Sequence, residues 1–297
     1  MKAIGSFFKN FVVYNHDMDI DRDVMQHEVP ALTDPNGQTW STVGLVPVTD
    51  EGFIFHSLDG MGLLFCVQFN ERILPAKVRD EHFRKTLDAI EQREGRKPTK
   101  KEYAELRDEA ERDLLPKAFI KRAKVFGLLT NSRLLIFTGS SKRQDDVLLI
   151  INHYLNDVGI DNTSIRRPSL KEAVSGMTSL ALEEDDWLSA TDHGVLRIEG
   201  EVKPTIRVKD KDIYSADVQT LLKQGYRVNE LGLRSLNVDA EFTLNKSMTV
   251  KRFNVGGDLI LSHGDTTADF HGAAWLVCRT ALDVWKEIES SFEDDEL

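Results

Sequence analysis

The sequence predicts an α+β protein in which mixed or antiparallel sheets with helices are interrupted by a projecting αα-hairpin arm. Strand-like runs precede residue 72 and resume after residue 124, and two highly charged helical runs lie between them. The part of the chain after residue 165 again alternates strands with helices. We therefore expect a central α+β domain of residues 1–72 plus 114–164, a helical hairpin of residues 73–113, and a second α+β domain of residues 165–297.

The first strands are indicated by aromatic and β-branched runs. Phe7–Tyr14 is such a run, and Phe53–Leu58 and Leu63–Phe69 are two more, joined by the turn-forming Asp59–Gly62. The acidic stretch His16–Asp23 is typical of a helix N-terminus. These strands supply the first part of the central domain.

The hairpin is predicted by two narrow apolar stripes on otherwise charged helices. Thr99 and Glu102 have the spacing of a capping box, which fixes the start of the second helix. A helix from Val78 to Gly95 would carry the tip roughly 27 Å from its base, at about 1.5 Å per residue. The stripes are Phe83, Leu87 and Ile90 in the first helix, and Tyr103, Leu106, Ala110 and Leu114 in the second.

After the hairpin the central domain resumes, and a second unit follows. Val125–Thr130 and Arg133–Thr138 are predicted strands, and a helix over 142–158 ends at Gly159. Ile165–Ser169 is interpreted as a linker. The second domain is expected to contain helices at 170–174, 215–224 and 267–288, and strands at 194–198, 205–209, 227–233, 238–244 and 248–255.

Charge is distributed unevenly along the chain. The formal net charge is −11, yet residues 71–143 hold 19 Lys/Arg against 12 Asp/Glu, a local balance of +7 that leaves −18 for the rest. No acidic residue lies between Leu114 and Gln144. A single basic surface on an acidic protein can hold a polyanion in one place and repel it elsewhere. The pattern favours a nucleic-acid partner.

Several function classes are disfavoured. No run approaches the 18 apolar residues of a membrane span, and no basic-then-apolar signal peptide follows Met1. Cys66 and Cys278 lie far apart without the ligand spacing of a zinc site, which fits a reducing cytoplasm. Gly139–Lys142 lacks the first glycine of a phosphate loop, so an ATP motor is not expected.

One cluster of His and carboxylate residues leaves an alternative open. His263, Asp265, Asp269 and His271 could form the metal site of a nuclease, but their spacing matches no known ligand pattern. The same residues could instead cap the terminal helix. We therefore expect no catalytic residue, metal ligand or cofactor.

Several strings in the chain resemble the RdgC family of recombination-associated proteins. They are NERILPAKV at 70–78 and LLPKAFIKR at 114–122, which bracket the hairpin, FFKNFVVY at 7–14, VGLVP at 43–47, residues 133–159, and TIRVKDKDI at 205–213. The resemblance implies an ATP-independent, sequence-tolerant protein that binds double-stranded DNA. It also implies that two subunits close into a ring around the duplex and limit access of the RecA recombinase.

The resemblance also assigns residues by position. Arg96 and Lys97 match a basic tip, Lys209 and Lys211 fall on a basic patch of the second domain, which Asp210 should weaken, and Phe119 matches an aromatic at the subunit contact. The expected dimer interface is Leu115, Pro116 and Phe119. The expected DNA contacts are Arg93, Arg96, Lys97, Lys100, Lys101, Lys117, Lys121, Arg122, Lys124, Lys209 and Lys211.

The leading hypothesis is thus a non-enzymatic, homodimeric protein that binds duplex DNA in the cytoplasm, in association with the nucleoid. RecA would be affected indirectly, through shared DNA, and no membrane partner is expected. Two alternatives are kept: the metal-dependent nuclease, and a protein-interaction module whose arm docks on an acidic partner.

Overall fold

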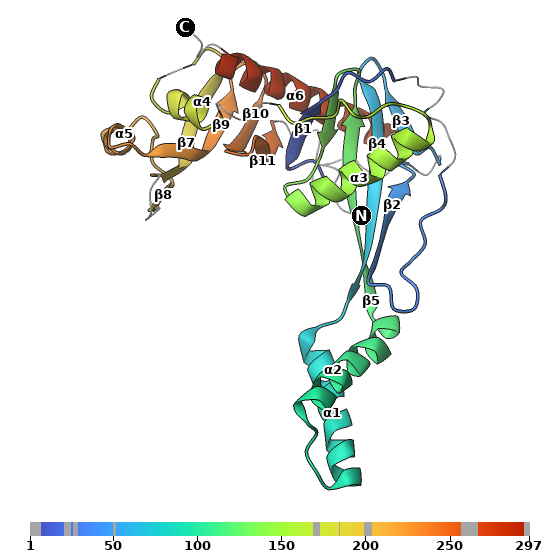
Figure 1. Ribbon diagram of the computed structural model, residues 1–297. Helices are drawn as coiled ribbons and strands as arrows, with labels where there is room; N and C mark the ends of the chain where they lie inside the picture. The colour runs from blue at the N-terminus through green and yellow to red at the C-terminus, as the bar shows by residue number, and fades with distance from the viewer. Residues whose placement is uncertain are drawn as a thin grey trace. The chain divides into compact units, whose positions relative to one another are not determined.

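Eleven strands of the computed structural model form a sheet whose order is β2-β4-β5-β6-β1-β11-β10-β9-β7-β8, with β3 paired to β4 outside this path (Figure 1). The structure describes residues 7–20, 25, 29–49, 52–168, 173–183, 185–198, 204–256 and 267–293, with side chains at 270–292 in the last range. The strands are β1 (Phe11–Asn15), β2 (Ser41–Val46), β3 (Phe55–Leu58), β4 (Gly62–Ile73), β5 (Phe119–Leu129), β6 (Arg133–Ile136), β7 (Leu188–Arg197), β8 (Thr205–Val208), β9 (Arg227–Ser235), β10 (Ala240–Asn245) and β11 (Thr249–Val255).

Six α-helices accompany the sheet within the described residues, so the predicted α+β class with an antiparallel sheet is confirmed. A single 3₁₀ turn, η3 (Leu115–Lys117), precedes β5. The helices are α1 (Ala76–Glu94), α2 (Lys100–Leu114), α3 (Ser141–Asp157), α4 (Ala173–Leu180), α5 (Ala216–Lys223) and α6 (Thr267–Glu293).

The chain divides into two compact units. Unit 1 is Met1–His27, Pro47–Cys66 and Val125–Leu297, and unit 2 is Glu28–Val46 and Val67–Lys124. Because β4 and β5 are long, their inner residues belong to unit 1 and their outer residues to unit 2. The predicted division at residues 73, 114 and 165 stays a prediction.

The first strand lies in the interior of the sheet. β1 pairs antiparallel with β6 through Val12↔Ile136 and with β11 through Phe11↔Val250. The described part of the expected linker is attached to the same strand, since Asn15 and Arg166 form an antiparallel bridge. Segments from both predicted α+β domains therefore pair with one strand.

Helices cover opposite faces of the sheet in unit 1. On one face, Phe126 of β5 contacts Phe270 of α6. On the other face, a Cβ added at the next residue, Gly127, would meet the ring of Phe65. Phe65 in turn contacts Phe55, which packs on Tyr154 of α3. Successive strand residues point to opposite faces, so α3 and α6 lie on different sides (Figure 1). α4 packs on β9 and against α6.

Several boundaries differ from those expected. β2 was not predicted, β4 and β5 extend further toward the α1/α2 helices, and β7 begins at Leu188 instead of Gly194. Residues 16–20 are not helical, and the rest of the acidic stretch lies outside the described residues. Ser215 occupies the N-cap position of α5, but its hydroxyl makes no capping hydrogen bond within the described residues.

Candidate nucleic-acid interface

The helices α1 and α2 of unit 2 pack through their apolar stripes. Leu87 and Ala110 are buried, and the rings of Phe83 and Tyr103 meet edge to face with centroids 5.1 Å apart. Both helices leave most of their remaining surface to solvent. This α1/α2 helix pair therefore presents its charged side chains outward.

The turn between the two helices is fixed by the local sequence. α1 ends at Gly95, whose φ of 64° is in the left-handed region that glycine adopts without strain. α2 begins with the predicted capping box: the Glu102 amide donates to the Thr99 hydroxyl, and the Thr99 amide donates to Glu102 Oε2 at 2.7 Å. The basic residues of the turn are thus held between two defined helix ends.

Arg96 is the best-anchored cation of this turn. Its Nη1 and Nη2 donate to the two carboxylate oxygens of Glu102 at 2.9 and 2.8 Å, and Nη2 also lies 2.9 Å from Glu94 Oε2. Hydrogen bonding to Glu102 and the charge of Glu94 raise the pKa of the Arg96 guanidinium. Hydrogen bonds from Arg96 and from Thr99 lower the pKa of Glu102. A phosphate that approaches Arg96 must therefore compete with these two carboxylates for its charge.

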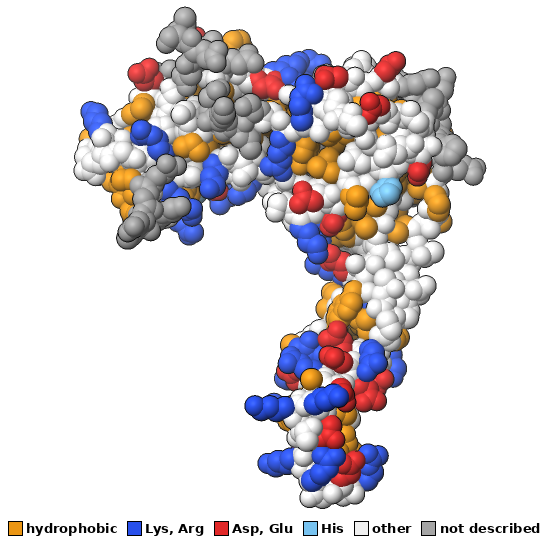
Figure 2. All heavy atoms as spheres, in the orientation of Figure 1, with side chains coloured by type: hydrophobic (Ala, Val, Ile, Leu, Met, Phe, Trp, Pro, Cys, Tyr) orange, Lys and Arg blue, Asp and Glu red, His pale blue; other side chains and the backbone are white. Residues whose placement is uncertain are grey.

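The other predicted cations of the turn differ in their partners. Arg93 pairs with Glu94 at 3.0 Å, and Lys101 lies 3.9 Å from Glu105. Lys97 and Lys100 are exposed, and within the described residues neither forms an ion pair. Figure 2 shows how blue and red side chains alternate over the helix pair. The freest positive charge of the turn thus belongs to these two lysines.

A second group of predicted DNA contacts lies on η3 and the outer part of β5. Lys117, Lys121, Arg122 and Lys124 are all exposed, and Arg122 donates to Asp34 Oδ2 at 2.6 Å. Residues alternate across a strand, so Lys121 shares a face with Phe119, whereas Arg122 and Lys124 lie on the other face. The predicted basic surface is therefore two-sided at this point.

Arg72 anchors this region from β4, a role the sequence did not suggest. Its guanidinium donates to the carbonyl oxygens of Leu115 and Pro35, both at 2.5 Å, and to Thr39 O at 3.2 Å. One side chain thus ties η3 to the segment before β2. The sequence could not predict these three hydrogen bonds, because their carbonyl acceptors come close to Arg72 only in the folded chain.

The residues expected at the dimer interface occupy different environments. Phe119 is 86% exposed, the largest value among the described large hydrophobic residues, and Pro116 is also exposed. Leu115 is buried in its own chain. An aromatic ring left in solvent is unfavourable for a monomer and suits a contact surface.

The predicted basic patch of the second domain is largely neutralised. Lys209 lies 3.9 Å from Asp210, and Lys211 pairs with Asp217. Hydrogen bonding and the charge of Lys211 lower the pKa of Asp217. Asp210 was expected to weaken this patch, and Asp217 is a further acidic neighbour that sequence reasoning missed.

The predicted His/carboxylate cluster lies mostly outside the residues whose side chains are described. His271, its described member, contacts His56 of β3, with Nδ1 and Nε2 2.9 Å apart. Across the described residues, no group of three or more His, Cys, Asp or Glu side chains could hold a metal ion. Cys66 and Cys278 are both buried and are not joined in a disulfide, and none of the described helices has the length and apolar character to cross a bilayer.

Comparison with known proteins decides the family. A sequence model of a protein family, described as "Putative exonuclease, RdgC", matches residues 6–286, nearly the whole chain. The chain belongs to the RdgC family. The matched residues include the α1/α2 helix pair, the strands β1 to β11 and most of α6.

Three curated relatives of this RdgC-family protein carry the same name. The recombination-associated protein RdgC of Aeromonas hydrophila is 25% identical over 278 residues, covering 89% of this chain and 88% of the relative. That of Proteus mirabilis is 27% identical over 276 residues, covering 89% of each chain. That of Pseudomonas syringae pv. tomato is 28% identical over 265 residues, covering 83% of this chain and 82% of the relative. These names give no enzymatic activity, whereas the family description mentions an exonuclease.

Proposed function

We propose that this RdgC-family protein binds double-stranded DNA without sequence specificity, as a homodimer that closes into a ring around the duplex. In this proposal the α1/α2 helix pair projects as an arm and limits access of RecA to the enclosed DNA. The observation that carries the proposal is the set of exposed lysines in unit 2 without a carboxylate partner among the described residues. They are the predicted contacts Lys97, Lys100, Lys117, Lys121 and Lys124, together with Lys77.

Recognition is expected to depend on phosphates. Lysine is a compact point charge that attracts a phosphate from many directions and carries no base-specific geometry. The remainder of the chain has a balance of −18, which would repel DNA from other surfaces. Binding should therefore be strong at low salt and tolerant of sequence.

The dimer is supported by Phe119. If its ring faces a second subunit, Lys121 lies beside that contact, and Arg122 and Lys124 point to the opposite side of β5. The DNA contacts of this strand would then come from Arg122 and Lys124. The salt bridge between Arg122 and Asp34 leaves Lys124 as the more available of the two.

Sedimentation with and without duplex DNA tests the assembly. A dimer that sediments with DNA of any sequence is expected, and a monomer that does not bind DNA at low salt would favour the alternative of docking on an acidic protein.

A salt titration tests the chemistry, since log K should fall linearly with log[salt] with a slope of about −0.9 per neutralised phosphate. Replacing Arg96 and Lys97 together by Ala should flatten the slope by up to roughly two units. As control, replacing Glu91 and Glu94 by Ala should leave affinity equal or higher.

The nuclease alternative is favoured by the family description and by the pairing of His271 with His56. Incubation of plasmid with Mg²⁺ or Mn²⁺ distinguishes it. Clean nicking that is lost in His271→Ala would support the nuclease. Intact plasmid under conditions where DNA is bound would support the non-enzymatic protein.

A further inference from the structure

A cavity of about 570 Å³ opens on unit 1, whereas the exposed lysines that carry the proposed function belong to unit 2. Its walls come from β7, β9, β10 and β11, and its side chains include His193, Arg234, Glu241 and Arg252. α4 packs on β9 in the same part of the sheet, but among the described residues none from a helix lines this cavity. No expected DNA-contact residue lines it either.

Irregular pairing of the strands shapes the cavity. The register of β7 on β9 shifts between Ala190 and Gly194, and the register of β10 on β11 shifts between Glu241 and Thr243. The first irregularity crosses Gly232 so closely that a Cβ there would lie 2.3 Å from Thr191 Oγ1. Such bulges occur beside functional sites, where they turn a side chain in a new direction. Here two of them contribute to one cavity.

The backbone of Arg252 is the next unusual feature. Its φ of 52° lies in the left-handed region, which is uncommon for a residue other than glycine. Its amide donates to the side chain of Asn10 at 3.2 Å, which holds this conformation. The arrangement places Arg252 Nη1 3.1 Å from His193 Nε2.

His193 has two neighbours that it cannot satisfy together. The same Nε2 atom lies 3.4 Å from Glu230 Oε1. A guanidinium only donates and a carboxylate only accepts, so one imidazole nitrogen can serve one of them at a time. Although burial alone raises the pKa of Glu230, Lys251 and His193 outweigh it and lower that pKa, so Glu230 stays ionised. An added acceptor near Arg252 would remove the conflict.

We propose that this cavity binds a phosphate group. A phosphate oxygen would accept from Arg252 in place of His193, and His193 could then donate from Nε2 to Glu230. Arginine suits this role because its planar fork can bond two phosphate oxygens. The two acidic residues of the lining do not prevent an anion from binding, because Glu241 is paired with Arg234 and Asp192 is exposed to solvent. The phosphate would come either from the backbone of bound DNA or from a free phosphate compound.

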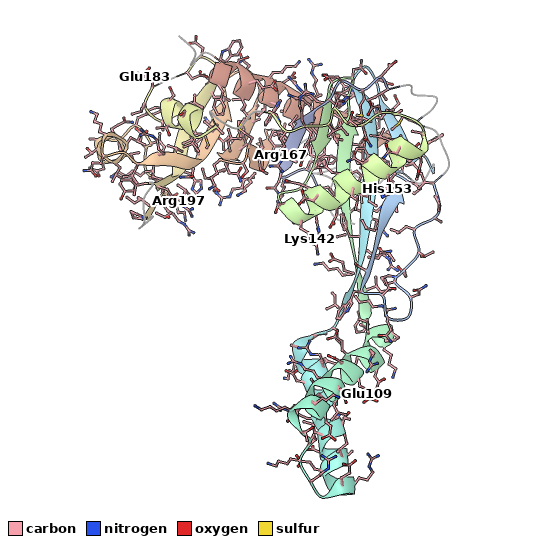
Figure 3. The ribbon with its side chains drawn as sticks, viewed as in Figure 1. Glu109, Lys142, His153, Arg167, Glu183 and Arg197 are labelled. Carbon is pink, nitrogen blue, oxygen red and sulfur yellow. The ribbon has the colours of Figure 1, made fainter. Side chains whose placement is uncertain are left out.

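Isothermal titration of the full chain with inorganic phosphate, and separately with a short DNA duplex, tests the proposal and distinguishes the sources. Arg252→Asn removes the charge and keeps a residue that tolerates the left-handed conformation. Arg197→Gln is the matched control, because Arg197 lies on β7, is exposed and does not line the cavity (Figure 3). His193→Gln is the second variant if Arg252→Asn fails to fold.

We expect a fall in affinity of at least tenfold for one probe in Arg252→Asn, and little change in Arg197→Gln. A fall for inorganic phosphate identifies a free phosphate compound, and a fall for the duplex alone identifies the DNA backbone. If Arg252→Asn bound both probes with the affinity of the wild type, the proposal would be overturned. The outcome is separable from the proposed function, because loss of DNA binding on replacing the unit 2 lysines leaves the phosphate titration unaffected.

Discussion

Arg96 and Glu102 are joined by two parallel hydrogen bonds, from Nη1 to Oε2 at 2.9 Å and from Nη2 to Oε1 at 2.8 Å. The same carboxylate accepts from the amide and the hydroxyl of Thr99. One glutamate therefore closes the capping box of α2 and holds the arginine of the turn. The arginine predicted to contact DNA at this turn thus already has a carboxylate partner.

This pairing predicts unequal effects at the turn. Lys97→Ala should flatten the salt dependence of DNA binding by about 0.9 units, and Arg96→Ala by less, because its charge is already shared with two carboxylates. Glu102→Gln should steepen the slope by freeing Arg96. Fluorescence titration of duplex DNA over a range of salt measures each slope.

The control for Glu102→Gln is Glu109→Gln, an exposed carboxylate on the same helix (Figure 3). It should change the slope little. Equal effects of Arg96→Ala and Lys97→Ala would show that the ion pair opens at no cost when DNA binds.

Phe119→Ala should weaken self-association without lowering thermal stability. The ring is 86% exposed, so its removal takes little packing from the monomer. An aromatic at the centre of an interface contributes about 2 kcal/mol, or roughly 30-fold in the dimer dissociation constant. Sedimentation equilibrium measures the dissociation constant. Tyr103→Ala, which removes another exposed aromatic ring, is the control. A dimer unaffected by Phe119→Ala would move the interface elsewhere.

Gly127→Ala should destabilise unit 1 by about 1–3 kcal/mol through overpacking. A Cβ at this position would lie 2.1 Å from the Phe65 ring. Phe65→Leu in the same chain should recover part of the loss, because it removes the ring that the new methyl meets. Urea denaturation compares them with Gly272→Ala, an open helical site where no loss is expected.

Glu287→Gln should stabilise the protein at neutral pH. Burial, above all, raises the pKa of this carboxyl, and its Oε2 has no hydrogen-bond partner among the described residues. The folded state therefore binds the proton more tightly than the unfolded state, whose carboxyl titrates near its ordinary value. Stability falls as pH rises from that value through the raised pKa, and the resulting penalty persists at pH 7.

Thermal denaturation between pH 4 and pH 8 tests this dependence. The wild type should lose stability relative to Glu287→Gln as pH rises. Glu183→Gln, at an exposed site, is the control and should follow the wild type (Figure 3). A difference between Glu287→Gln and wild type that shrinks with rising pH would contradict the assigned sign.

Sequence periodicity predicted elements that bury a continuous apolar face. Val147, Ile151, Ala274 and Val277 follow the 3.6-residue spacing of α3 and α6, and all four are buried. The capping box of Thr99 and Glu102 was also confirmed, because its two hydrogen bonds depend only on local spacing. Local rules were sufficient where one element determines its own geometry.

The ends of several strands and the ion-pair partners of the basic residues could not be predicted from the sequence, because both depend on the folded chain. The outer parts of β4 and β5 carry Glu71, Arg72, Lys121 and Arg122, which give no strand-like apolar pattern, yet backbone pairing continues through them. β7 begins in a polar segment whose bulge reflects the close approach to Gly232. At the candidate interface, exposed cations were predictable from composition, whereas the partners Glu94 and Asp34 depend on folding.

The interior position of β1 also bears on how the chain is synthesised. One edge of this strand can pair with β6 once residue 136 has emerged, but its other edge must wait for Val250. For most of translation a hydrophobic strand thus presents unpaired amides and carbonyls, which invites pairing with other nascent chains. Contacts between residues so distant in sequence form slowly, so the second edge of β1 is expected to pair late in the folding of the sheet.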